Sequence, residues 1–144
     1  MNDYFNMLKK EFPNLELEEN KILLGDTNIC DVISFCKNSS KILFESLFTI
    51  VAIDYSEYIE LLYILNSYIT QETLILSTKV TDTTQSVITI FPSAHFDECE
   101  IYDLFGVKFV GNDELERLFL PKSWKGHPLL KKYIMQDERL AWNE

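Results

Sequence analysis

The sequence is poor in the residues that build flexible loops, since it holds only four glycines and four prolines among 144 residues. Four glycines leave little room for a phosphate-cradling loop, and the chain contains no G-x-S-x-G motif for a nucleophilic serine. No uninterrupted apolar run reaches the roughly 18 residues that a membrane-spanning helix requires. These absences argue against nucleotide-binding loops, serine nucleophiles and a direct membrane span.

Cysteine is also scarce: Cys30, Cys36 and Cys99 are odd in number and form no C-x-x-C pair. No secretion signal follows Met1, so we expect a reduced, cytoplasmic chain without disulfides. An iron–sulfur cluster normally takes four thiolates, which these three scattered cysteines do not supply. The sequence therefore predicts no cluster bound by this chain.

Basic residues are outnumbered, with 13 lysines and arginines against 23 aspartates and glutamates and a net charge of −10. Such a balance argues against nucleic acid as a partner, because phosphate binding requires a basic surface. The charge is uneven, since residues 93–116 hold seven acids and one base, whereas residues 117–136 hold five bases and no acid. This pattern fits a partner of mixed charge or a solvated surface.

What the chain does have is a regular apolar pattern, with 47% hydrophobic residues. Helical spacing of apolar residues predicts helices near residues 4–12 and 29–39, the second capped by Asp26 or Thr27. Strands are expected at 15–17, 21–24, 41–54, 58–70 and 73–80, while 87–91 reads as either a strand or a helical turn. A further helix is expected at 94–105, with Ser93 as its cap and Gly106 as its end.

These elements predict an α+β fold. It is a two-layer domain with helices on one face of a mixed, largely antiparallel sheet formed from residues 15–91, followed by an extended C-terminal arm. Residues 1–106 form the core, and residues 107–144 form the arm within the same single domain. The arm has little periodicity, which is typical of a segment that packs along its own domain or along a partner.

Acidic residues lie on two sides of the predicted 94–105 helix, since Glu98 and Glu100 are about 160° apart around its axis. A simple surface helix would segregate its acids to one side. We therefore expect at least one carboxylate to turn inward and pair with an arginine or lysine. That partner lies on another subunit, or is Lys108, Arg117 or Lys125 of this chain.

A metal site is the alternative use of this helix. His95 and Cys99 are four residues apart and share a helix face, while Asp97, Glu100 and Asp103 form a carboxylate stripe. Two ligands still leave a tetrahedral site incomplete. A free-standing metal protein or enzyme built on His95, Cys99 and the 97–103 carboxylates is the alternative function.

The run from Phe91 to Tyr133 resembles the signature region of the 30 kDa subunit (the C subunit) of complex I-type NADH:quinone oxidoreductases. Related small subunits of energy-converting nickel–iron hydrogenases and formate hydrogenlyases share that region. The residues that match the family pattern in order are Glu98, Glu100, Tyr102, Asp103, Phe105, Gly106, Leu120, Pro121, Trp124, Gly126, His127, Pro128, Leu129, Lys131 and Tyr133. Cys99 departs from the pattern, because the family usually has arginine there.

The resemblance implies a non-catalytic structural subunit that binds no cofactor or metal. The complex would hold iron–sulfur clusters, with flavin and NADH or a nickel–iron site, in other subunits. The partners implied are the large quinone-site or nickel–iron-type subunit and the iron–sulfur subunits, at the cytoplasmic side of the cell membrane and peripheral to it.

The docking residues that we expect are Glu98, Glu100, Tyr102, Asp103, Phe105, Gly106, Pro121, Trp124, Gly126, His127, Pro128, Lys131 and Tyr133. His127 is interpreted as fixing a turn, with a proton relay towards a quinone site as the alternative. Trp124 is expected to anchor the interface, because large rings without a periodic pattern commonly do so.

Overall fold

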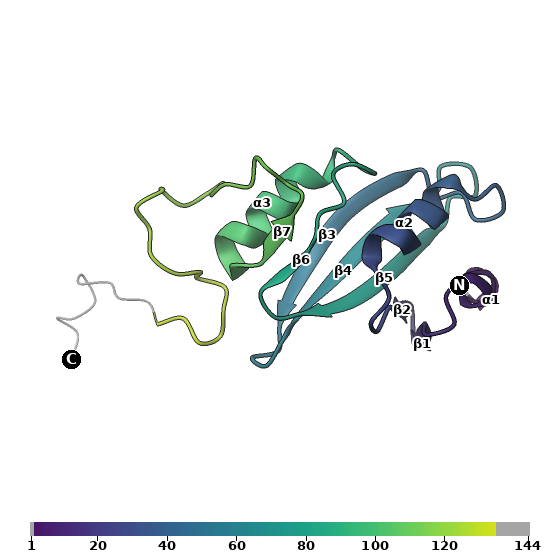
Figure 1. The fold of residues 1–144 in the computed structure, drawn as a ribbon, viewed down its shortest axis with the longest axis horizontal. Coiled ribbons are helices and arrows are strands. Elements are labelled where there is room, and N and C mark those ends of the chain that lie inside the picture. The colour runs from purple at the N-terminus through teal and green to yellow at the C-terminus, as the bar shows by residue number, and fades with distance from the viewer. Residues whose placement is uncertain (1, 135–144) are drawn as a thin grey trace.

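Five strands form the central sheet of the computed structural model, which describes residues 2–134 of the chain (Figure 1). They are β1 (Glu16–Glu18), β2 (Lys21–Leu23), β3 (Ser46–Asp54), β4 (Ile59–Asn66) and β5 (Thr73–Val80), in the order β1-β2-β5-β4-β3. The β2–β5 pair is parallel and the other three pairs are antiparallel. The mixed, largely antiparallel sheet of the predicted α+β fold is therefore confirmed.

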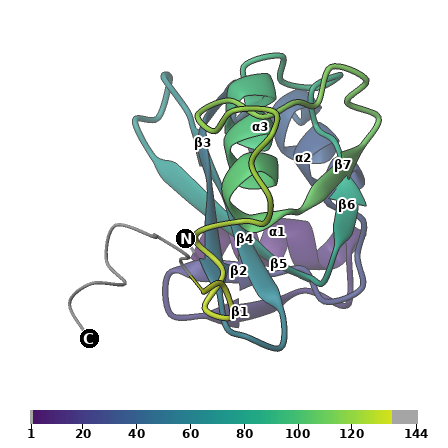
Figure 2. The same cartoon turned by 90° about the vertical axis from the view of Figure 1, so that its left-hand side faces the viewer.

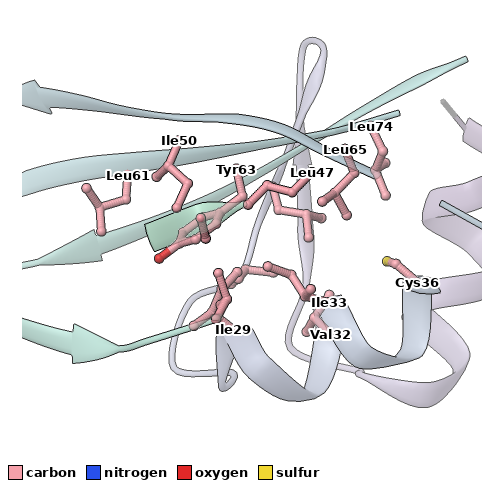
Figure 3. Close-up of a cluster of buried hydrophobic side chains, with 14 of the residues drawn as sticks. Ile29, Val32, Ile33, Cys36, Leu47, Ile50, Leu61, Tyr63, Leu65 and Leu74 are labelled. Atoms are coloured by element: carbon pink, nitrogen blue, oxygen red, sulfur yellow. The ribbon is translucent and has the colours of Figure 1, made fainter. Parts of the chain in front are cut away.

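One face of the sheet builds the core. Tyr63 of β4 lies opposite Ile50 of β3 and Leu76 of β5, and because paired residues share a face, all three point the same way. Ile29 and Val32 lie on α2 (Ile29–Asn38), which packs on this face with its apolar stripe (Figure 3). The α2 helix is thus held by burial of one apolar side.

The start of α2 differs from the prediction. Its cap is Asn28, whose side chain accepts a hydrogen bond from the backbone N–H of Cys30 at 2.8 Å. Asp26 and Thr27 lie further from the helix start and were wrongly predicted as caps. Asparagine caps a helix about as well as aspartate does, and the prediction named only the two residues before it.

The first helix, α1 (Asn2–Glu11), packs at the end of the core. The Tyr4 ring meets Phe44 edge-on at 5.2 Å between centroids, and Phe12 meets Phe35 of α2 at 5.8 Å. Leu8 is fully buried in the same core cluster. The apolar spacing predicted for this helix is confirmed by these contacts.

The α3 helix (Ala94–Phe105) has the predicted bounds and lies on the same side of the sheet as α2 (Figure 2). Its Asp97 carboxylate accepts a hydrogen bond from the backbone N–H of Ile50 at 2.8 Å. Because β3 is an edge strand, that N–H has no strand partner, so α3 also protects the edge. The preceding residues 87–91 form a turn, in which the N–H of Phe91 donates to the Val87 carbonyl at 2.8 Å.

A second sheet of two strands forms where the chain, after α3, comes back beside the segment that precedes α3. β6 (Thr83–Gln85) pairs in parallel with β7 (Lys108–Val110). The five-stranded sheet thus ends at Val80 and not at residue 91, and residues 108–110 belong to the core and not to the arm. Residues 111–134 then run beside α3 without regular secondary structure (Figures 1 and 2).

Candidate docking site

Asp103 organises the start of the arm. Its carboxylate Oδ2 accepts three successive backbone N–H groups, from Leu118 at 3.1 Å, Phe119 at 2.8 Å and Leu120 at 2.9 Å. Its other oxygen, Oδ1, accepts from Arg117 Nη1 at 2.8 Å. The Asp103 side chain is fully buried. One carboxylate therefore ties four consecutive arm residues to α3.

The electrostatics of Asp103 follow from these contacts. Burial by itself raises the pKa of the Asp103 carboxyl, but the hydrogen bonds from Leu120, Arg117, Phe119 and Leu118 together bring that pKa below its ordinary value. Every one of these donors favours the charged form. Asp103 is thus an ionised structural carboxylate and is not poised as a general acid.

Glu98 is the second buried carboxylate of α3. The Ser86 hydroxyl and the Val87 N–H donate to its Oε1 at 3.0 and 2.9 Å, and the Asn112 side-chain amide donates to Oε2 at 2.9 Å. Burial raises the pKa of the Glu98 carboxyl, and these neutral donors offset only part of the shift. Glu98 thus joins α3 to the turn before it and to the residues after β7.

These contacts test the prediction that at least one carboxylate of the 94–105 helix faces inward and pairs with a base. Two carboxylates of α3, Glu98 and Asp103, are fully buried, and the one with an ionic partner, Asp103, pairs with Arg117 of this chain. The expected contact between Glu98 or Asp103 and a partner subunit is wrong for the described conformation, because both side chains are fully buried. Glu100 is exposed, so its docking role stays a prediction.

His127 fixes the turn where the arm returns to α3. Its ring nitrogen Nδ1 lies 2.9 Å from the Asp103 carbonyl oxygen, and since a carbonyl only accepts, Nδ1 carries the proton. Gly106 has a φ of +80°, and a Cβ there would lie 2.6 Å from His127 Cδ2. Glycine is required at 106 for both reasons. This hydrogen bond favours the turn-fixing interpretation of His127.

The end of the described arm is anchored a second time. The backbone N–H of Lys131 donates to Asp54 Oδ2 at 2.7 Å, and the N–H of Ser56 donates to Asp54 Oδ1 at 2.7 Å. These two backbone donors, Lys131 first, hold the pKa of the Asp54 carboxyl below its usual value. Sequence reasoning missed Asp54, because nothing local connects residues 77 positions apart.

A cavity of about 710 Å³ lies between the returning arm and the β3–β4 turn. His127, Tyr133, Asp54 and Tyr58 are among the residues that line it. The Asp54 carboxylate is already occupied by the two backbone donors just described.

The arm anchors leave apolar side chains facing outward. Phe119 is 64% exposed and Leu129 is 52% exposed, although the Leu129 N–H is bonded to the Leu104 carbonyl of α3 at 3.0 Å. Phe96, on α3 itself, is 66% exposed. We call Phe96, Glu100, Phe119, Trp124 and Leu129 the docking face. Fixed backbone with exposed large side chains is typical of a surface that meets a partner.

The predicted docking residues separate by burial. Exposed are Glu100, Pro121, Trp124, Gly126 and Lys131; half-buried are Tyr102, Phe105, Gly106, His127, Pro128 and Tyr133; buried are Glu98 and Asp103. Of these, Asp103 and His127 hold the arm against α3 by the hydrogen bonds described above, and Glu98 joins α3 to the residues after β7.

The alternative function, a metal site built on His95 and Cys99, finds no third ligand among the described residues. Cys99 Sγ lies 3.9 Å from His95 Nε2, so the two share a helix face as predicted. Within residues 2–134, however, no three His, Cys, Asp or Glu side chains gather where they could hold a metal ion.

In the same range, none of the helices is long and apolar enough to cross a membrane.

The fold is a small α+β domain whose C-terminal arm is tied to α3 and leaves large apolar side chains exposed. The chain belongs to the family described as respiratory-chain NADH dehydrogenase, 30 Kd subunit, whose model matches residues 22–139. The resemblance to the 30 kDa subunit is thus confirmed, while the hydrogenase and formate hydrogenlyase branches stay predictions.

Individual relatives agree with the family. The C subunit of NADH-quinone oxidoreductase from Roseiflexus sp. (strain RS-1) is 31% identical over 120 residues, which cover 79% of this chain and 69% of the relative. The C/D subunit of NADH-quinone oxidoreductase from Phocaeicola vulgatus is 38% identical over 88 residues, covering 58% of this chain and 16% of the relative.

Among solved structures, one chain of the membrane-bound sulfane sulfur reductase, an archaeal respiratory membrane complex, has a similar fold. The TM-score is 0.70 at 23% identity, over 83% of this chain and 75% of that chain. The described fold of this protein is therefore one that a chain of a membrane complex also adopts.

Proposed function

We propose that this chain is a non-catalytic structural subunit in the hydrophilic arm of a complex I-type NADH:quinone oxidoreductase or a related membrane respiratory complex. It docks on the larger subunit that forms the quinone or nickel–iron site. The observation that carries the proposal is the docking face, which combines internally anchored backbone with exposed Phe96, Phe119 and Trp124.

Membership of this family supports the proposal that the chain works beside a larger subunit in a complex. The relative named as a C/D subunit is matched over only 16% of its length, so a region similar to this chain occurs there within one much longer polypeptide. Joining in one chain keeps two domains at high effective concentration, as suits domains that also contact each other. The larger partner of the proposed complex thus corresponds to a D-type subunit.

Cofactors are assigned elsewhere in this proposal. Iron–sulfur clusters, with flavin and NADH or a nickel–iron site, are held by other subunits, and this chain supplies rigid support at the cytoplasmic side of the membrane, peripheral to it.

The C-terminal arm of this chain is steered towards an acidic surface of its partner by three exposed lysines, Lys125, Lys131 and Lys132. Raised salt should therefore slow assembly.

The experiment is Trp124→Ala in the assembled complex. Truncation of an aromatic anchor costs about 2 kcal/mol of binding, which is about 30-fold in the dissociation constant. The matched control is Tyr68→Ala, because Tyr68 is an exposed aromatic residue in the β4–β5 turn, outside the docking face. We expect Trp124→Ala to lose this subunit from the purified complex and Tyr68→Ala to retain it.

The melting temperature of the isolated chain separates docking from folding. Both variants should melt within about 2 °C of the unsubstituted protein, since Trp124 and Tyr68 are exposed and surface substitutions change stability little. Full retention of the Trp124→Ala chain in the complex contradicts the proposed docking. Stoichiometric metal in the isolated chain, or turnover without partner subunits, contradicts the proposed non-catalytic role.

A further inference from the structure

The sheet has a second face, opposite to α2 and α3. The register places one row of residues across all five strands on it: Val51, Leu62, Ser77, Leu23 and Glu16. Neighbouring rows add Ile53, Ile64 and Ile75 from β3, β4 and β5. We call these eight residues, together with Lys21 and Glu60, the second sheet face.

The middle of this face is apolar and accessible. Val51 is 39% exposed and Ile53 is 36% exposed, and Leu62, Ile64 and Ile75 are half-buried. An antiparallel strand with one solvated face normally alternates apolar and polar residues. β4 instead reads IELLYILN, apolar on both sides except at its ends. Such a composition is typical of strands that are covered on both faces.

The buried polar groups of the face are already paired. Lys21 Nζ and the Ser77 hydroxyl each donate to Glu60 Oε1 at 2.6 Å, and Lys21 also lies 3.4 Å from Glu18. Glu60 is buried although it belongs to this face. A partner covering the face would therefore meet no unpaired buried charge among these residues, which removes a main cost of association.

The exposed charged residues at the margin of the second sheet face indicate which kind of partner would cover it. Glu16 and Glu18 are exposed on β1, where the nearest base, Lys21, is committed to Glu60 and Glu18. Lys79, which the register also places on this face, lies on β5, with its Nζ 4.7 Å from the centroid of the Tyr58 ring. A second copy of this chain would bring another net charge of −10 and the same acidic margin, so like charges oppose self-association. A basic partner is favoured by the same charges.

The dimensions indicate the shape of the occupant. Five strands spaced about 4.8 Å apart span about 19 Å, and the eight residues of β4 span about 26 Å. A helix of about 17 residues has that length and a diameter of about 10 Å. The opposite face of this sheet is already covered by helices, and a sheet covered by helices on both faces is a common layered arrangement.

From these observations we propose that the second sheet face binds an amphipathic helical segment of another chain, with an apolar stripe against Val51, Leu62 and Ile64 and lysines or arginines beside β1. This interface is separate from the docking face. It is independent of which complex the chain joins.

The test places a photo-crosslinking p-benzoylphenylalanine at position 51, 110 or 119 in the assembled complex, with adducts mapped by peptide mass spectrometry. Val110 is the control, because it is an exposed valine on β7, outside both faces. The expected adduct at 51 lies in a helical segment of a different chain that carries apolar and basic residues, and position 110 gives none.

Position 119 reports on the docking face and separates the two proposals. An adduct at 119 without one at 51 overturns the second interface and leaves docking intact, whereas an adduct at 51 alone contradicts docking. An adduct between position 51 and a second copy of this chain, or an acidic segment, overturns the occupant proposed here.

Charge substitutions test the sign of the partner. Glu16→Lys, on the strand beside which the basic residues are proposed, should weaken retention in the complex at least tenfold, Glu16→Gln should weaken it less, and Val110→Lys should leave it unchanged. The isolated variants should melt within about 2 °C of the unsubstituted chain, which excludes misfolding. A larger loss with glutamine than with lysine overturns the basic occupant, and equal retention of all three variants overturns the interface.

Discussion

Asp103→Asn removes the carboxylate that holds the arm. One orientation of the asparagine side chain turns its NH₂ group towards the three N–H donors of Leu118, Phe119 and Leu120. The other turns the NH₂ group towards the Arg117 guanidinium. Either way a donor faces donors, and Arg117 loses its ionic partner.

The magnitude follows from burial. The Asp103 side chain is fully buried and that of Arg117 is 15% exposed. Removing one partner of a buried ion pair costs about 3–5 kcal/mol, and the partial exposure of Arg117 places this pair near the lower end, at about 3 kcal/mol. That is a large part of the roughly 5–15 kcal/mol by which a domain is stable.

Two measurements on the isolated chain check this prediction. Backbone amide exchange at residues 118–120 should accelerate about 100-fold, because about 3 kcal/mol of local stability is lost. The melting temperature should fall by about 10 °C if the arm and core unfold together. The control is Glu100→Gln, an exposed carboxylate on the same helix, which should change stability by less than about 0.5 kcal/mol.

Unchanged exchange at residues 118–120 in the Asp103→Asn variant would refute the assignment of Asp103 as the arm's anchor. An equal destabilisation by Glu100→Gln would refute it as well, since the effect would then come from helix charge.

The pH dependence of stability adds a third check. The pKa of Asp103 is lowered in the folded state, so its contribution is present above the unfolded value of about 3.9 and is lost as pH falls through the folded pKa.

Three further outcomes are expected. Gly106→Ala should lower the melting temperature more than Gly25→Ala does. Both positions have positive φ, but a Cβ at 106 meets the His127 ring at 2.6 Å, whereas one at 25 has its nearest neighbour at 3.7 Å; equal shifts would contradict the His127 packing. For Glu98, whose pKa is raised, the sign is opposite to that of Asp103. Its stabilising contribution is present below the unfolded value of about 4.3 and is lost as pH rises through the folded pKa. Urea unfolding of Glu98→Gln against the unsubstituted chain should therefore show a difference that shrinks with rising pH, and a growing difference would contradict the raised pKa. Replacement of Asp54 by Asn should release Lys131 and speed its amide exchange without changing exchange at residues 118–120, because the two anchors are separate; coupled changes at both sites would contradict this independence.

Local signals in the sequence were sufficient for most of the fold. Apolar spacing and the breaks at Pro13 and Gly106 predicted α1 and α3, because helix ends depend on residues within one turn. The β3–β5 set followed from three apolar runs joined by short polar breaks. The run 87–91 stayed undecided, since a five-residue apolar segment fits a strand and a turn equally well.

The site was predicted in part. The two-sided acids of the 94–105 helix correctly indicated an inward carboxylate, but not that both Glu98 and Asp103 turn inward. The partner, Arg117, was one of several bases within reach, and sequence spacing does not rank them. Asp54 was missed because the hydrogen bond to Lys131 spans the chain.

The sequence by itself determined the family, the net charge of −10 and the order of helices and strands, because each depends on residue identities or on neighbours along the chain. Only the tertiary structure decided which carboxylates are buried, since burial depends on what packs against α3 from residues 86–87 and 112–120. It also decided that the two faces of the sheet differ. The register aligns Val51, Leu62 and Leu23 on a side that neither α2 nor α3 covers, and strand register is set by pairing between distant segments.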